Sequence, residues 1–361
     1  MDPQLLLFKR QYLQLVEPGF LLWPPKQLLR NADAQSWLFK NMFDPERNDR
    51  LPPERYQLRV LKPLLTRIEQ SIEDPEEDVG ATVLPSCKMH AIVLEISDAL
   101  MNHLSSLLAT ELPSEAAAVQ QKTYVTFTCP FPDCNPAEDE IDGRTVTLLE
   151  RRHLISGSQT TGFRTWEAAL HLGSYLLTPQ GSALIRGRNV FELGAGTGFL
   201  SILCAKHLEA KHVTTTDGDE GVVEALKENL FLNGLDDEQK VLTSVLRWGR
   251  GLKGSWVEDD CEAWPYDTII GADITYDKLG ISALVATLRF LLDMRPNLKI
   301  IIAGAVRNAE TFETFRHACL RSKFQVEEID YQPEAVRDQK ALFYATVMPL
   351  KILLIEKGSA A

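Results

Sequence analysis

From about residue 163 onward, short β-type runs alternate with segments in which apolar residues recur every three or four positions. The seven expected strands are NVFEL, HVTTTD, VLTSVLRW, DTIIGAD, LKIIIAGAV, KFQVEEID and LFYATVMPL. The expected helices are FRTWEAALHLGSYLL, FLSILCAKHL, GVVEALKENLFLN, ISALVATLRFLLDM and FETFRHACL. This alternation predicts an α/β fold, a parallel sheet with helices on both faces. Such a sheet binds its ligand beyond the carboxyl ends of its strands.

The preceding part of the chain has a different pattern. Residues 1–113 are predicted to form a small helical domain, because four stretches show helical spacing between breaks rich in proline or acid. These stretches are LLLFKRQYLQLV, QLLRNADAQSWLFKNMF, RYQLRVLKPLLTRIEQSI and HAIVLEISDALMNHLSSLL. Residues 114–162 are interpreted as a linker with a β-hairpin formed by TYVTFT and RTVTLLE. Residues 163–361 then form the α/β domain.

Composition limits the classes of partner. The chain has a net charge of -12, so free nucleic acid is repelled on average and a basic protein is the better partner. We find no apolar run of about 18 residues and no signal peptide, which predicts a cytoplasmic protein without a membrane span, with the nucleus as the alternative location. Six scattered cysteines contain no CxxC pair, which favours reduced thiols and no metal. A metal or disulfide at Cys129 and Cys134 is the less favoured alternative. We also expect a monomer.

A glycine-rich turn, ELGAGTG, follows the first strand of the α/β domain. Gly194, Ala195 and Gly196 would let a ligand approach the backbone closely. The spacing is GxGxG, Phe199 stands where a dinucleotide fingerprint needs its last glycine, and no P-loop lysine follows. Glu192 would repel a pyrophosphate, but it can meet a positively charged amino acid moiety directly or through water. The turn therefore favours a ligand other than a dinucleotide.

Three further residues predict an adenosine attached to such an amino acid. Asp217 ends HVTTTD, where a carboxylate can accept both ribose hydroxyls, although Asp there can instead cap a helix. Trp248 could stack against adenine, and Trp166 could cover the methionine end of the ligand from its helix. Core packing is the alternative for both tryptophans. Together with the glycine turn, these residues predict S-adenosylmethionine as the cofactor.

The fourth strand ends in GADITY, which places Asp273 and Tyr276 where a transferable methyl group should lie. A carboxylate can orient a lysine ammonium, and an aromatic ring favours cationic nitrogen. Asp273 is predicted to orient the amine, with a general-base role left open. The alternative is an N-cap aspartate and a packed tyrosine. Amino methylases of nucleic acids carry Asn/Asp-Pro-Pro-aromatic at this point, and the absence of prolines here argues against a base as acceptor.

In the order and spacing of these motifs, the chain resembles the seven-β-strand protein methyltransferases that carry an Asp-x-x-Tyr motif. ELGAGTG, TTTD, LRW and GADITY carry the resemblance. SGSQTTGFRTWEAALHL and AGAVRNAETFETF are similar to segments of elongation factor 2 lysine methyltransferases. The resemblance implies a Rossmann-like, seven-stranded class I methyltransferase domain that methylates a lysine of elongation factor 2. It also implies that Trp166, the Gly194 to Gly196 turn, Asp217, Trp248 and Ala272 line the cofactor.

One residue departs from the family pattern. Many relatives carry an acid just before the tryptophan of the third strand, and here Arg247 stands there. Two alternatives stay open, namely a different protein substrate and a cofactor-binding protein without turnover. The helical N-terminal region either docks the substrate or covers a sheet edge.

Overall fold

The structure is a computed structural model that describes residues 2–73, 95–111, 121–130, 143–152, 161–249 and 251–358. The chain divides into two compact units. One unit comprises Met1–Ala118 and Thr123–Val125, and the other comprises Val119–Lys122 and Thr126–Ala361. Each unit has its own apolar core, so each is described by itself.

The first unit is helical, as the sequence predicted. Its helices are α1 (Pro3–Leu13), η1 (Pro18–Phe20), α2 (Lys26–Leu29), α3 (Ala32–Leu38), η2 (Phe39–Phe43), α4 (Glu54–Glu73) and α5 (Asp98–Ala109). The second predicted helix is interrupted, because the Asn31 side chain accepts hydrogen bonds from the N–H groups of Asp33 and Ala34 and thereby starts α3. Phe8, Tyr12 and Phe43 are among the fully buried side chains of this core. The start of the fourth predicted helix, residues 90–94, lies outside the described residues.

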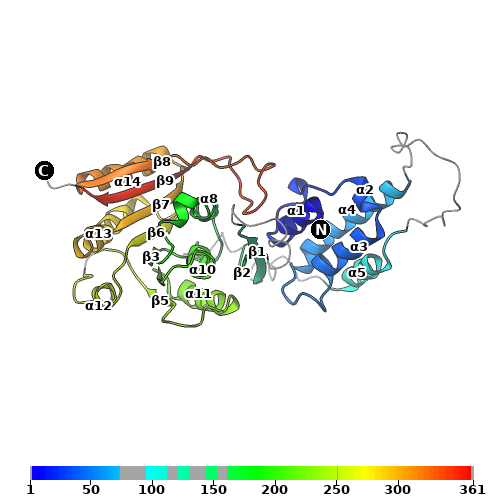
Figure 1. The fold of residues 1–361 in the computed structure, drawn as a ribbon, viewed down its shortest axis with the longest axis horizontal. Helices are drawn as coiled ribbons and strands as arrows, with labels where there is room; N and C mark the ends of the chain where they lie inside the picture. Colours follow the sequence, from blue (N-terminus) through cyan, green and yellow to red (C-terminus); the bar gives the residue numbers. More distant parts are fainter. Residues whose placement is uncertain are drawn as a thin grey trace. The chain divides into compact units, whose positions relative to one another are not determined.

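The second unit contains the predicted seven-stranded sheet (Figure 1). Its strands are β3 (Asn189–Leu193), β4 (His212–Asp217), β5 (Val241–Val245), β6 (Thr268–Ala272), β7 (Lys299–Ala305), β8 (Phe324–Ile329) and β9 (Leu350–Lys357). The strand order is β5-β4-β3-β6-β7-β9-β8. β3 to β7 run parallel to one another, while β9 is antiparallel to both β7 and β8. Because β3 lies between β4 and β6, the strand order reverses there, at the point where α/β sheets bind ligands.

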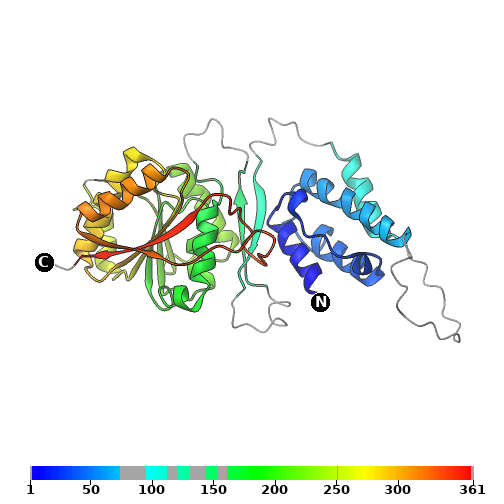
Figure 2. The same cartoon turned by 90° about the horizontal axis from the view of Figure 1, so that it is seen from above.

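Helices cover both faces of this sheet (Figures 1 and 2). α8 (Glu167–Leu176), α10 (Phe199–Lys206) and α11 (Glu220–Leu232) lie on one face, and α9 (Pro179–Ser182) follows α8. α12 (Trp256–Ala263), α13 (Lys278–Met294) and α14 (Ala309–Arg321) lie on the other. Every second strand residue points toward α13 and α14, including Ile269, Ile300 and Ile302 in the core cluster with Leu288 and Phe315. The α/β fold class is therefore confirmed.

The last predicted strand, LFYATVMPL, is wrong. Only its last residue, Leu350, enters the sheet, as the first residue of β9. Leu342 has a left-handed backbone with φ of 47°. The N–H of Tyr344 donates to the side chain of Gln339 at 2.9 Å, so this group is unavailable to a strand ladder. The Tyr344 hydroxyl also lies 3.0 Å from Nδ1 of His171, which fixes this loop against α8. Helix α12 was not predicted, because its eight residues, WVEDDCEA, give a weak apolar pattern.

The two strands of the predicted hairpin are present as β1 (Thr123–Thr128) and β2 (Thr145–Glu150). Two buried amides, Asn229 in α11 and Asn233 directly after it, hold β2. The N–H of Leu149 donates to Asn229 at 2.8 Å, and the Asn233 amide donates to the Thr147 carbonyl at 2.7 Å. Residues 131–142, which contain the expected Pro-rich loop, lie outside the described residues. Strand β2 is also held by α10, because the Lys206 side chain donates to the Thr145 carbonyl at 2.9 Å.

Candidate active site

A cavity of about 460 Å³ lies where the parallel strands end. A volume of roughly 300–1,000 Å³ is typical of sites for small molecules. The cavity wall includes all ten predicted site residues: Trp166, Glu192, Gly194, Ala195, Gly196, Asp217, Trp248, Ala272, Asp273 and Tyr276. Residues that are up to 110 positions apart therefore meet around one space.

The glycine turn between β3 and α10 needs its glycines for two reasons. Gly194 and Gly196 have left-handed backbones, with φ of 64° and 55°, which side chains rarely tolerate. A Cβ added to Gly194 would lie 2.6 Å from Cγ2 of Ile274, and one added to Gly196 would lie 3.2 Å from the Gly162 carbonyl oxygen. The glycines thus permit close packing within the chain as well as the approach of a ligand. The N–H of Ala195 donates to the Thr216 carbonyl at 2.8 Å and fixes the turn against β4.

Glu192 lies beneath this turn and is almost fully buried. Its Oε2 accepts hydrogen bonds from both the backbone N–H, at 3.1 Å, and the hydroxyl of Ser201 in the first turns of α10. Burial raises the pKa of Glu192 to about 8, although the Ser201 hydrogen bonds act in the opposite direction. The carboxyl group therefore joins β3 to α10 as well as lining the cavity.

Asp217 ends β4 and faces the glycine turn. Its Oδ2 accepts from the N–H of Gly196 and its Oδ1 from the N–H of Asp219, both at 3.1 Å. The cap of α11 is Asp219, whose side chain accepts from the N–H of Val222 at 3.0 Å. The helix-cap alternative for Asp217 is therefore wrong. Burial raises the pKa of Asp217, and its backbone hydrogen bonds lower it.

Trp248 lies three residues past β5, since that strand is shorter than predicted. Its ring stands over the glycine turn, because a Cβ on Gly194 would lie 3.4 Å from the Cζ2 of Trp248. The indole Nε1 is buried and has no hydrogen-bond partner in the described part of the chain. A buried donor of this kind is rare in folded proteins and suits a ligand acceptor. Arg247 lies at the cavity edge and pairs with Glu220 at 3.2 Å.

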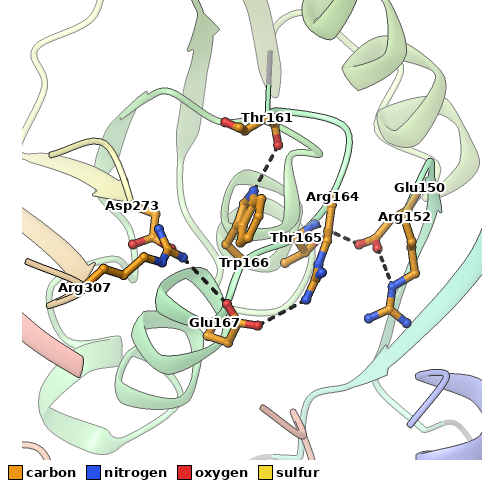
Figure 3. Close-up of polar contacts among 9 residues, drawn as sticks. All are labelled: Glu150, Arg152, Thr161, Arg164, Thr165, Trp166, Glu167, Asp273 and Arg307. Atoms are coloured by element: carbon orange, nitrogen blue, oxygen red, sulfur yellow. Dashed lines mark hydrogen bonds and ion pairs between the residues drawn. The ribbon is translucent and has the colours of Figure 1, made fainter. Parts of the chain in front are cut away.

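Trp166 is the residue that precedes α8, whereas the sequence placed it within the helix. Its Nε1 donates to the carbonyl oxygen of Thr161 at 3.0 Å. The guanidinium groups of Arg164 and Arg307 lie 4.9 Å and 5.2 Å from its ring centroid, on its two sides (Figure 3). Glu167 meets both arginines, at 3.2 Å and 3.9 Å. The indole ring is therefore held between two cations that share one acid.

Glu150, a residue that the sequence reasoning missed, supports this wall from β2 (Figure 3). Its Oε1 accepts from the N–H of Thr165 at 3.1 Å, and its Oε2 lies 3.6 Å from Arg152. Burial raises the pKa of Glu150, and the charge of Arg152 partly opposes this. The only sequence signal was an acid at the end of an otherwise apolar strand. The hairpin thus reaches the site by fixing the residue next to Trp166.

Asp273 follows β6 and has a left-handed backbone, with φ of 53°. Its Oδ1 accepts from the N–H of Ala305 at 2.9 Å, and its Oδ2 pairs with Arg307 at 3.2 Å. Burial raises the pKa of Asp273, while the Ala305 hydrogen bond and the charge of Arg307 lower it. The cap of α13 is Asp277, so the helix-cap alternative for Asp273 is wrong.

Tyr276 lies at the rim of the cavity with 63% of its surface exposed, so the packed-tyrosine alternative is also wrong. Ala272 ends β6 and pairs with Ala303 of β7. Arg307, beyond the end of β7 and also in the cavity wall, was not assigned a role from the sequence. Its position at the same sheet edge was the available signal, because parallel strands bring their carboxyl ends together.

The described residues contain no group of three or more His, Cys, Asp or Glu side chains that could hold a metal ion. Cys129 is buried, which raises its pKa to about 12, and Cys134 lies outside the described residues. Among the helices that the structure describes, none is both long and apolar enough to cross a membrane.

The donor set of the cavity fits S-adenosylmethionine. Asp217 offers a half-buried carboxylate beside the glycine turn, and Trp248 offers an aromatic ring with an unpaired buried N–H. Asp217 and Asp273 are acidic groups in the cavity wall, which suit a ligand with a positively charged sulfonium and amine better than a polyphosphate.

Comparison with known proteins agrees with this fit. A family model described as lysine methyltransferase matches residues 153–318. The chain is 43% identical to the protein-lysine N-methyltransferase EFM3 of Chaetomium thermophilum over 99% of this chain and 98% of that protein. It is 31% identical to EFM3 of Saccharomyces cerevisiae, over 59% of this chain and 66% of that protein. It is also 31% identical to human protein-lysine N-methyltransferase EEF2KMT, over 48% of this chain and 54% of that protein.

The nearly full-length match and the residues of the cavity both indicate methyl transfer from S-adenosylmethionine to a protein lysine. The chain belongs to the lysine methyltransferase family, as a protein-lysine N-methyltransferase that uses S-adenosylmethionine.

Proposed function

We propose that this enzyme methylates a lysine of translation elongation factor 2 in the cytoplasm, acting as a monomer. The two segments that resemble elongation factor 2 lysine methyltransferases supply Trp166 and Arg307, which contact each other in the cavity wall. This contact carries the proposal, because the resemblance is concentrated at the reaction site. The name of the human relative, EEF2KMT, is consistent with the same substrate.

One end of the cavity is proposed to hold the cofactor. Asp217 accepts the ribose hydroxyls, and Trp248 stacks on the adenine. Glu192 meets the amino acid moiety of the cofactor directly or through water, and Trp166 covers its methionine end. Gly194, Ala195, Gly196 and Ala272 supply backbone that the cofactor can approach closely. This assignment is supported by the position of these residues around one space at the reversal of strand order.

The other end is proposed to receive the lysine. The cofactor supplies a methyl group on a sulfonium, whose carbon–sulfur bond breaks with both electrons staying on sulfur. Asp273 orients the lysine nitrogen, and the exposed ring of Tyr276 forms the wall of its entrance. Holding the nitrogen in line with the methyl group supplies much of the rate, since orientation removes an entropic barrier.

A protein amine is favoured over a nucleic-acid base as the acceptor. The sequence Asp-Ile-Thr-Tyr lacks the prolines of the amino methylases that act on bases. A net charge of -12 also repels nucleic acid on average.

The test is mass spectrometry of elongation factor 2 from cells with and without this enzyme. We expect one lysine to lose its methyl groups when the enzyme is removed, and to regain them when the wild-type chain is restored. Restoring Asp273→Asn instead should leave that lysine unmodified, which controls for effects of the protein other than catalysis. Unchanged methylation of elongation factor 2 would overturn the proposed substrate.

A second experiment separates the alternatives for the substrate. The purified enzyme is incubated with labelled S-adenosylmethionine and a lysate from cells that lack it. A single labelled band at the size of elongation factor 2 supports the proposal. A band of another size indicates a different protein substrate. No band, with cofactor binding retained, indicates a protein without turnover.

A further inference from the structure

Arg307 joins the proposed acceptor acid to the aromatic wall of the cavity (Figure 3). Its Nη2 donates to Oδ2 of Asp273 at 3.2 Å and lies 3.9 Å from Oε2 of Glu167. Its guanidinium group also lies 5.2 Å from the ring centroid of Trp166. The Arg307 side chain is 40% exposed, whereas that of Asp273 is only 8% exposed. The arginine therefore reaches inward from the rim to an acid that water hardly contacts.

Several charged or titratable groups surround the cavity, from the carboxyl ends of β3 to β7 and from the start of α8. They are Arg164, Glu167, Glu192, Asp217, Arg247, Asp273, Tyr276 and Arg307. Among them, the charges that act on Asp273 are those of Arg307 and Glu167, with opposite signs. Arg307 lowers the pKa of Asp273, and Glu167 raises it. Glu167 is itself shared with Arg164, at 3.2 Å.

The reaction needs the lysine nitrogen as a free amine. The ammonium must first release one proton to water, and its lone pair then forms the nitrogen–carbon bond as the carbon–sulfur bond breaks. An isolated carboxylate beside the lysine nitrogen would stabilise the ammonium form and so raise the pKa of the amine. A permanent cation next to that carboxylate has the opposite effect, because an arginine does not deprotonate in proteins. The pair can therefore orient the nitrogen without holding it as an ammonium.

We propose that Arg307 is a positioning residue for methyl transfer, which keeps Asp273 ionised and in place and keeps the acceptor lysine in its neutral, reactive form. This inference rests on the proposed role of Asp273 in receiving the lysine. Glu167 restrains Arg307 against Trp166, so that one guanidinium group connects the cofactor wall to the acceptor acid.

The test compares the pH dependence of kcat for the full chain and its variants, with elongation factor 2 as substrate. Losing the cation in Arg307→Gln raises the pKa of both Asp273 and the bound amine. Both changes reduce the reactive form at a given pH, so the acidic limb of the profile should move up by about one pH unit. Arg307→Lys keeps the charge and should restore most of the wild-type profile.

Two further variants separate charge from structure. Glu167→Gln removes a negative charge near Asp273 and should move the acidic limb in the opposite direction, to lower pH. Arg316→Gln is the matched control, since Arg316 lies outside the cavity wall on α14 and pairs with Glu313 at 3.6 Å. Its profile should equal that of the wild type. A rate that falls equally at every pH in Arg307→Gln, or a failure of Arg307→Lys to restore the profile, would overturn the proposal.

A measurement without substrate keeps this inference separate from the identity of the substrate. Carbon NMR of the Asp273 carboxyl group should give a higher pKa in Arg307→Gln than in the wild type or Arg307→Lys. An unchanged value would overturn the inference about Arg307. If instead the wild type fails to methylate elongation factor 2 while the NMR shift is present, only the proposed substrate is wrong.

Discussion

Asp273 has a left-handed backbone, which asparagine adopts at least as readily as aspartate. Asp273→Asn therefore removes the charge without adding backbone strain. We expect kcat to fall by about 100-fold or more, because the lysine nitrogen loses its orienting carboxylate. Cofactor affinity, measured by calorimetry, should change little.

Asp277→Asn is the matched control for this variant, since asparagine caps a helix as well as aspartate and Asp277 caps α13. It should keep the wild-type rate. A near-normal rate for Asp273→Asn would show that the orienting role is wrong.

Asp217 and Asp219 are two residues apart and differ in role, since Asp217 is the proposed ribose ligand and Asp219 caps α11. They therefore form a matched pair for testing cofactor binding and stability. Asp217→Ala should weaken cofactor binding by about 1–3 kcal/mol, as for a buried polar contact that is lost. Asp219→Ala should lower stability by about 1 kcal/mol, because it removes the cap of α11. Calorimetric titration and thermal unfolding measure the two effects. Equal cofactor affinity in all three proteins would contradict the ribose assignment.

At the residue scale, the sequence predicted which side chains surround the cavity but not their partners. Asp217 and Asp273 could be placed because one ends a strand and the other directly follows one, and strand ends meet at one edge. The pairing of Asp273 with Arg307 joins residues 34 positions apart. No local pattern specifies such a contact, because it depends on the order of the strands in the sheet.

Among the structural elements, the junction of β3 and α10 depends on a buried acid. The pKa of Glu192 is raised by burial to about 8, so the folded chain binds this proton more tightly than the unfolded chain does. The stability that this proton provides is complete below the ordinary pKa of 4.5 and is lost as the pH rises through about 8. A glutamine at this position cannot ionise and keeps an oxygen for the Ser201 hydrogen bonds.

Glu192→Gln should therefore gain stability relative to the wild type as the pH rises from about 5 to 8, by at most about 1.4 kcal/mol per pH unit. Urea unfolding of both proteins at the two ends of this range measures the change. A stability difference that stays constant across the range would contradict the raised pKa.

Sequence patterns located most elements of the α/β unit because apolar residues recur every three or four positions in its helices and form short β-type runs in its strands. The last strand of the sheet, β9, was not predicted, and the reason is physical. LFYATVMPL and LKILLIEK are both apolar, and periodicity does not say which of two adjacent runs enters the sheet. The first run stays a loop because the N–H of Tyr344 donates to Gln339 and the Tyr344 hydroxyl contacts His171.

At the scale of the whole molecule, the residues that line the cavity lie between Thr161 and Arg307, all in the second unit. A fragment of residues 119–361 should therefore bind S-adenosylmethionine as the full chain does. If the helical unit docks the substrate, the fragment should still methylate a short lysine peptide but lose most of its rate on intact elongation factor 2. Calorimetry and a labelled-methyl assay measure the two properties.

The alternative, in which the helical unit only covers the sheet, predicts a fragment that binds the cofactor poorly or aggregates. Full activity of the fragment on intact elongation factor 2 would exclude docking by the helical unit.

The antiparallel strand β9 has a consequence for the synthesis of this protein. It is the most C-terminal strand, yet it lies between β7 and β8 and supplies the neighbour that β8 pairs with. While the ribosome still holds residues 350–357, the growing chain has an open edge on β7 and an unpaired β8. Open strand edges favour aggregation, so we expect the nascent chain to be prone to aggregation during this interval.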